Sequence, residues 1–249
     1  MPYVELPGSR TYHEITGAGE PLLLLHGGFC SLEATGDLNR LLSARYRVHG
    51  PERPGHGRTP DQPQPYAYAA MVDHTLAYLD AIGVPRAHVV GFSDGAITGL
   101  LLARDHPRRV ASLVAISANL DPSGFVPDEQ AALSVSARQH EQLGEEYGRL
   151  SPDGAGHADT VVGKLLDLWK REPQITPDSL ASVTAPTLVM AGDRDMVTLE
   201  HTASIAAAVP GAQLCVVPGA GHLLVRECPE LVGAVVTRFL ASVPALAGR

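Results

Sequence analysis

The sequence predicts an α/β fold in which a mostly parallel sheet carries helices on both faces. Apolar strand-like runs and helical patterns alternate along most of the 249 residues, which is the pattern that parallel sheets produce. Several runs, such as PLLLLHG at 21–27 and AHVVGF at 87–92, are apolar almost throughout, as strands covered on both faces are. Between residues 119 and 184 the alternation stops and charge and proline increase, so we expect an insertion over one edge of the sheet.

Each element can be assigned in chain order. The runs YVELP and RTYHEIT predict an antiparallel hairpin that turns at Pro7 and Gly8. Apolar runs predict further strands at 21–27, 46–50, 87–92, 110–117, 186–192 and 212–219. Helical patterns occupy 68–83, 94–107, 199–209 and 229–242, with weaker helical patches over 129–150 and 159–170 in the insertion. Gly83 is the expected C-terminal stop of the first helix.

Composition limits the kinds of partner. A formal net charge of −8 argues against nucleic acid, which would need a basic surface. There is no apolar run of about 18 residues that could span a membrane, and the N-terminal segment lacks a signal-peptide pattern. Cys30, Cys215 and Cys228 are too widely spaced for a metal motif or a disulfide framework. We therefore expect a cytoplasmic monomer or homodimer whose partner is a small-molecule substrate, with no metal and no cofactor.

The pentapeptide GFSDG at 91–95 marks the first candidate site residue. In open α/β sheets, chemistry gathers at the carboxyl ends of the strands. Ser93 follows an apolar strand and precedes a helix, and G-x-S-x-G in that context holds a serine hydroxyl clear of the backbone. Ser93 is therefore the candidate nucleophile.

A serine nucleophile needs a base, and the base needs an orienting group. His222, in PGAGH, directly follows a late strand and has a glycine-rich loop that lets it turn inward. The sequence AGDRD follows the strand at 186–192 and offers Asp193 and Asp195. Asp195 is preferred because it lies further into the loop, which leaves Asp193 to fix the turn. The chain order Ser, Asp, His fits this type of sheet.

An acyl-transfer site also needs two N–H donors for the oxyanion. The backbone N–H of Asp94 is the first candidate, because it lies at the start of a helix whose dipole favours negative charge. The second donor is expected from the loop HGGF, with Gly28 preferred and Phe29 as the alternative. His26 is expected to support this loop by hydrogen bonding.

The motifs HGGF, PERPGHGRT, GFSDG, AGDRD and PGAGH, in this order and spacing, resemble the α/β-hydrolase superfamily along essentially the whole chain. The resemblance implies an eight-stranded sheet with a small helical cap over the site, and it assigns the triad Ser93, Asp195 and His222. The core would then comprise residues 1–118 and 185–249, and the cap residues 119–184. Glu52 stands where relatives often have Asp, in a loop that is mainly structural.

Two alternative roles are consistent with the carboxylate of Asp94. It can stabilise the first turn of its helix through the dipole, or it can hold a cation on the substrate. The second reading follows from the similarity of the 91–107 stretch to the valacyclovir hydrolase (biphenyl-hydrolase-like) branch, in which this acid meets the α-amino group of amino-acid esters. The expected substrate contacts are Asp94, Phe29 and Trp169. Tyr147, Phe125 and Leu168 are, with Trp169, candidates to line an acyl pocket.

The leading hypothesis is a serine hydrolase that cleaves a small carboxylic ester, thioester, amide or lactone through an acyl-enzyme on Ser93. An α-amino-acid ester is one form of that substrate. One alternative is a ligand receptor that keeps the triad but turns over slowly. Another is perhydrolysis, C–C bond hydrolysis or a lyase reaction on the same scaffold, because this scaffold hosts many reactions.

Overall fold

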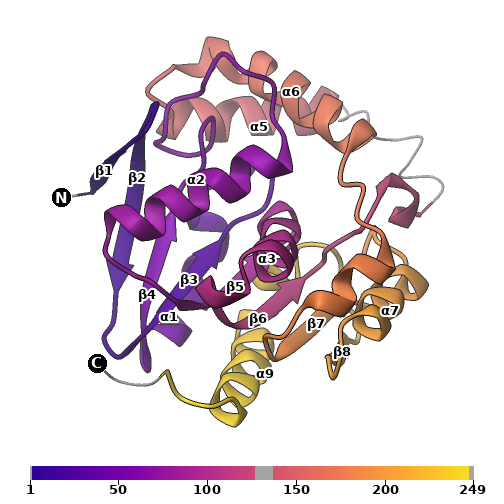
Figure 1. The fold of residues 1–249 in the computed structure, drawn as a ribbon. Coiled ribbons are helices and arrows are strands. Elements are labelled where there is room, and N and C mark those ends of the chain that lie inside the picture. The colour runs from indigo at the N-terminus through magenta and orange to yellow at the C-terminus, as the bar shows by residue number, and fades with distance from the viewer. Residues whose placement is uncertain (1, 127–136, 247–249) are drawn as a thin grey trace.

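One eight-stranded sheet organises the chain, in the order β1-β2-β4-β3-β5-β6-β7-β8 (Figure 1). The computed structural model describes residues 2–126 and 137–246. The hairpin of β1 (Tyr3–Leu6) and β2 (Ser9–Thr16) is antiparallel and joins the sheet antiparallel to β4, whereas the other pairs are parallel. The predicted hairpin and the mostly parallel sheet are confirmed. The remaining strands are β3 (Glu20–Leu25), β4 (Tyr46–Pro51), β5 (Ala87–Phe92), β6 (Val110–Ile116), β7 (Thr187–Gly192) and β8 (Gln213–Val217).

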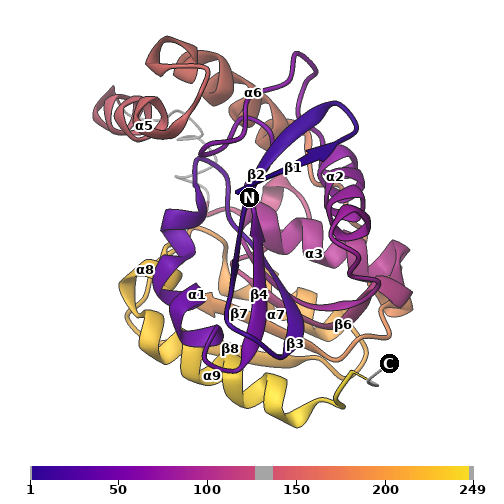
Figure 2. The ribbon, with the colours of Figure 1, turned by 90° about the vertical axis from the view of Figure 1, so that its left-hand side faces the viewer.

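Helices cover both faces of this sheet, as predicted (Figure 2). Successive side chains of a strand point to opposite faces, so Leu23 and Leu25 of β3 enter one buried cluster and Leu22 and Leu24 enter the other. This explains why the central strands are apolar throughout. The first cluster packs against α2 (Tyr68–Ala81), α3 (Asp94–Asp105) and α7 (Leu199–Ala208), and the second against α1 (Gly36–Leu42), α8 (Leu224–Glu227) and α9 (Pro229–Ser242).

The end of α2 follows the predicted glycine stop. Gly83 has φ 68°, a conformation that favours glycine. The N–H of Val84 donates to the carbonyl of Leu79 at 2.9 Å, which satisfies a carbonyl of the last helical turn. Two short helices, α1 and α8, were not predicted, because neither is long enough to establish a helical period.

Residues 119–184 contribute helices that lie together beyond one end of the sheet (Figures 1 and 2). The described helices are α5 (Ala137–Leu150) and α6 (Ala158–Arg171), with short 3-10 turns at Pro122–Gly124, Ala155–His157 and Pro177–Ser182. The patch predicted at 159–170 corresponds to α6. The patch predicted at 129–150 begins outside the described residues and continues as α5. The boundaries proposed for a cap stay a prediction.

Within the described ranges, no helix combines the length and the apolar character needed to cross a membrane.

Candidate active site

Ser93 lies in the sharp turn between β5 and α3, where it is only partly buried. Its backbone has φ 52° and ψ −120°, a conformation that costs a non-glycine residue free energy. Small neighbours make the turn possible: a Cβ at Gly91 would lie 2.2 Å from the carbonyl oxygen of Gly95, and one at Gly95 would lie 2.3 Å from that of Leu25. The two glycines of the motif are therefore required by close backbone approach.

The structure brings the three predicted residues Ser93, His222 and Asp195 together. His222 Nε2 lies 3.1 Å from Ser93 Oγ, and His222 Nδ1 lies 2.7 Å from Asp195 Oδ1. An ionised carboxylate can only accept, so Nδ1 carries the proton in this contact and Nε2 is left as an acceptor. This arrangement allows the imidazole to receive the serine proton.

The structure distinguishes the two acids that follow β7. Asp195 is buried, and it also accepts from Val197 N–H at 3.1 Å and from the Ser117 hydroxyl at 2.5 Å. Burial acts to raise the pKa of Asp195, but the hydrogen bonds from His222, Ser117 and Val197 hold that pKa below its ordinary value. Asp193 instead accepts from Gly219 N–H at 2.7 Å and fixes the turn after β8.

The two segments predicted to supply the oxyanion donors, the start of α3 and the HGGF loop, meet beside Ser93. Asp94 is the first residue of α3, so its N–H has no carbonyl four residues earlier within the helix. A Cβ at Gly27 would lie 3.1 Å from Ser93 Cβ, which brings the HGGF loop against the turn. Phe29, in the same loop, has φ 50°. The assignment of Gly28 or Phe29 as the second donor stays a prediction.

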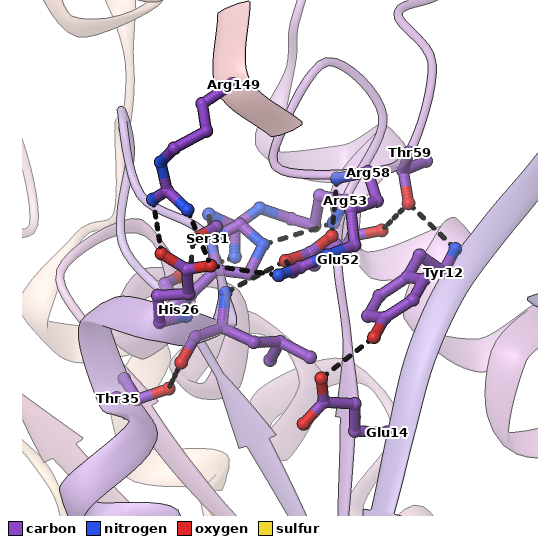
Figure 3. Close-up of polar contacts among 12 residues, drawn as sticks. Tyr12, Glu14, His26, Ser31, Thr35, Glu52, Arg53, Arg58, Thr59 and Arg149 are labelled. Atoms are coloured by element: carbon purple, nitrogen blue, oxygen red, sulfur yellow. Dashed lines mark hydrogen bonds and ion pairs between the residues drawn. The ribbon is translucent and has the colours of Figure 1, made fainter. Parts of the chain in front are cut away.

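Arg53 and His26, the first residue of the HGGF loop, hold that loop through hydrogen bonds, and Figure 3 labels both residues. Arg53 is buried and donates to the carbonyls of His26 at 2.6 Å and Gly27 at 2.9 Å. His26 is fully buried, and burial holds its pKa well below the ordinary value. It accepts at Nε2 from the Arg53 N–H, 3.1 Å away. His26 therefore stays neutral and structural, in agreement with its predicted role.

Glu52 organises the next loop and connects it toward α5 (Figure 3). Its buried carboxylate accepts from the N–H groups of Leu32 at 3.1 Å and Arg58 at 2.5 Å, and from the Arg58 guanidinium at 2.9 Å. Arg58 also pairs with Glu33 at 2.9 Å, and Glu33 pairs with Arg149 of α5 at 2.5 Å. The Glu in place of the usual Asp therefore has a complete set of partners.

The Asp94 carboxylate is held by two donors from other elements. Its Oδ1 accepts from Tyr68 OH at 2.7 Å and from Trp169 Nε1 at 2.9 Å, which joins α2, α3 and α6 at one atom. Its Oδ2 is buried without a hydrogen-bond partner among the described residues. A Cβ at Gly28 would lie 2.6 Å from that oxygen and 2.4 Å from the Trp169 ring. Trp169 therefore lies directly on the HGGF loop.

The predicted pocket residues of the insertion separate into different places. Trp169 contacts Asp94 and packs edge-on against Phe29, with ring centroids 4.9 Å apart. Leu168 and Phe125 are buried. Tyr147 lines a cavity of about 40 Å³, also lined by Phe29, that lies between the HGGF loop and helices α5 and α6. Neither Ser93 nor Trp169 lines that cavity.

Sequence reasoning missed three residues that contact this site: Tyr68, Arg53 and Ser117. Ser117 stands directly after an apolar strand, so its position at the sheet edge was a usable signal. Tyr68 and Arg53 carried no such signal, because their partners lie 26 or 27 residues away along the chain.

Comparisons with known proteins agree with this architecture. A model of the alpha/beta hydrolase family matches residues 22–235, and the chain belongs to this family.

Relatives of known name extend over nearly the whole chain. The 2-hydroxymuconate semialdehyde hydrolase of Pseudomonas putida is 30% identical over 267 residues, covering 96% of this chain and 93% of its own length. The pimeloyl-(acyl-carrier protein) methyl ester esterase of Xanthomonas campestris pv. campestris (strain B100) is 26% identical over 260 residues, covering 93% and 99%. Among solved structures, Est816, described as an N-acyl homoserine lactone degrading enzyme, aligns with a TM-score of 0.77 and 27% identity over 96% of this chain and 100% of its own. The chain is therefore an enzyme of the hydrolase class.

Proposed function

We propose that this enzyme is a serine hydrolase that cleaves small carboxylic esters, including cyclic ones, through an acyl-enzyme on Ser93. His222 takes the Ser93 proton as Oγ attacks the acyl carbon, and the oxyanion accepts hydrogen bonds from Asp94 N–H and from Gly28 or Phe29. His222 then protonates the departing alcohol. A water molecule, deprotonated by His222, attacks the acyl carbon, and the acid leaves as Ser93 regains its proton.

The observation that carries this proposal is the continuous contact from Ser93 Oγ through the His222 ring to the buried Asp195 carboxylate. Asp195 remains charged in this environment because its hydrogen bonds lower its pKa, so it can stabilise the imidazolium that forms during attack. The ester class is supported by two similar proteins, one named as a methyl ester esterase and one as a lactone-degrading enzyme.

Replacement of the nucleophile tests the proposal. Ser93→Ala removes the attacking oxygen and should lower turnover of p-nitrophenyl acetate by about 10⁴- to 10⁶-fold. Steady-state release of p-nitrophenol should continue over many turnovers in the wild-type enzyme. Ester hydrolysis that survives Ser93→Ala unchanged would contradict the proposal, and a single stoichiometric burst would favour the slow-turnover receptor instead.

A further inference from the structure

Ser117 shares an unusual backbone conformation with two residues of the proposed site. Among the described non-glycine residues, positive φ angles occur at Phe29 (50°), Ser93 (52°) and Ser117 (57°). The three follow β3, β5 and β6, which are adjacent in the sheet. Conformations of this kind cost about 1–3 kcal/mol each and persist where the surroundings impose them, often at active sites. The third position therefore needs an explanation, because Ser117 is neither the nucleophile nor an oxyanion donor.

The contacts of Ser117 explain its backbone conformation. Its side chain is buried, and its Oγ donates to Asp195 Oδ2 at 2.5 Å. The same oxygen lies 3.5 Å from the carbonyl of His222. The Ser117 N–H donates to Met190 O of β7 at 2.8 Å, which holds the residue against the strand that leads to the acid. The strained backbone thus directs one hydroxyl at the carboxylate oxygen that His222 does not use.

We propose that Ser117 is a positioning residue for the proposed hydrolase: its hydroxyl fixes Asp195 Oδ2 so that Oδ1 faces His222 Nδ1. This inference rests on the proposed function. Among the described residues, the other donors to Asp195 are Val197 N–H and His222, both at Oδ1. Without the hydroxyl, the carboxylate can rotate about its Cβ–Cγ bond, and Oδ2 becomes a buried acceptor that no donor satisfies.

The loss of that donor should also change the pH profile. A carboxylate that is free to turn away from His222 Nδ1 stabilises the imidazolium less during attack. The acid limb of the kcat/KM profile, which reports the essential base of the free enzyme, should therefore move to lower pH. The other charged groups on the adjoining segments are Asp193 and Arg194 beside Asp195, Arg226 and Glu227 on α8, and Asp94. Asp94 is buried, and the other four are exposed, so solvent screens them.

Three variants distinguish the effect of the Ser117 hydroxyl from the effect of its backbone conformation and from the effect of losing any buried serine hydroxyl. Ser117→Ala removes the hydroxyl and keeps the strained conformation, whereas Ser117→Gly removes it and relaxes the backbone. Ser112→Ala is the matched control, because Ser112 is a buried serine of β6, the strand that precedes Ser117, and its hydroxyl lies 2.8 Å from His88 Nδ1. Emission from Trp169, the single tryptophan, reports whether each variant keeps the native site.

Both Ser117 variants should lower kcat for p-nitrophenyl acetate by about 10-fold, the scale of one hydrogen bond to a charged group, and should move the acid limb to lower pH. Ser112→Ala should change neither. A wild-type pH profile in both Ser117 variants, or full recovery in Ser117→Gly alone, would overturn the role of the hydroxyl. If Ser93→Ala also retained activity, the proposed function itself would fail, which is a separate result.

Discussion

At the scale of single residues, Asp94 poses an electrostatic problem. A carboxylate one position after the nucleophile would oppose a developing oxyanion if its charge faced the acyl carbon. The structure directs Oδ1 at two donors, Tyr68 OH and Trp169 Nε1. Burial lowers the pKa of the Arg53 guanidinium, and the attraction to Asp94 opposes that effect without reversing it. We infer that the carboxylate anchors Trp169 over the HGGF loop, which differs from the cation-binding reading.

The variant Asp94→Asn distinguishes the two roles. The asparagine amide keeps one acceptor oxygen for Tyr68 and Trp169 but loses the charge. If Asp94 anchors Trp169, the variant should change kcat/KM for a phenylalanyl ester and for its deaminated analogue by the same factor, within about 3-fold. A loss confined to the amino substrate would instead show that the carboxylate meets an ammonium group. Trp169→Phe is the companion variant, since it removes the indole N–H donor together with part of the ring that packs on the HGGF loop.

Among the secondary-structure elements, the loops after β3 and β4 are joined by hydrogen bonds to a buried carboxylate. Glu52 has no exposed side-chain surface and satisfies N–H groups from both loops. Gly57, with φ 53°, leaves no room for a side chain, because a Cβ there would lie 2.2 Å from the Glu52 carboxyl carbon. The loop that supports Arg53, and through it the HGGF carbonyls, therefore depends on this one buried acid.

Glu52→Gln should lower the free energy of unfolding by about 2–3 kcal/mol, because the amide leaves donors facing donors in a buried site. Urea denaturation at pH 7 measures the change. Glu5→Gln is the control, since Glu5 forms an exposed ion pair with Arg10 and should change stability by less than about 1 kcal/mol. Equal effects of the two substitutions would show that the buried cluster is not a stabilising unit.

At the scale of the whole molecule, buried histidines link stability to pH. Burial lowers the pKa of His56 to about 3 and that of His74 to about 4, and it places the pKa of His26 well below its usual value. An unfolded histidine titrates near pH 6.5, so below that pH the unfolded chain binds more protons than the folded one. Stability should therefore be present in full above about pH 7 and should fall as the pH drops toward 4.

His56→Gln tests this linkage. Between pH 7 and pH 5, the wild-type free energy of unfolding should fall by about 2 kcal/mol more than that of the variant, the amount expected for one histidine with these two pKa values. Urea titrations at the two pH values give the difference. An unchanged pH slope in the variant would show that His56 is not the group responsible.

The sequence predicted most of the regular elements and brought Ser93, Asp195 and His222 forward as site residues, but it did not predict the side chains that surround these three. Apolar periodicity identified the strands, and position after a strand identified Ser93, Asp195 and His222, because the parallel topology brings carboxyl ends together. The roles of Ser117 and Trp169 depend on contacts between residues 78 and 75 positions apart. Such contacts are determined by how α6 and the segment after β6 pack, which no local pattern encodes.

Covalent labelling shows whether Ser93 is the nucleophile that His222 activates. Incubation with a fluorophosphonate, followed by peptide mass mapping, should find one adduct per chain, on Ser93. The adduct should be absent in Ser93→Ala and should form far more slowly in His222→Ala. An enzyme that hydrolyses esters but carries no adduct on Ser93, or carries it on another residue, would contradict the account.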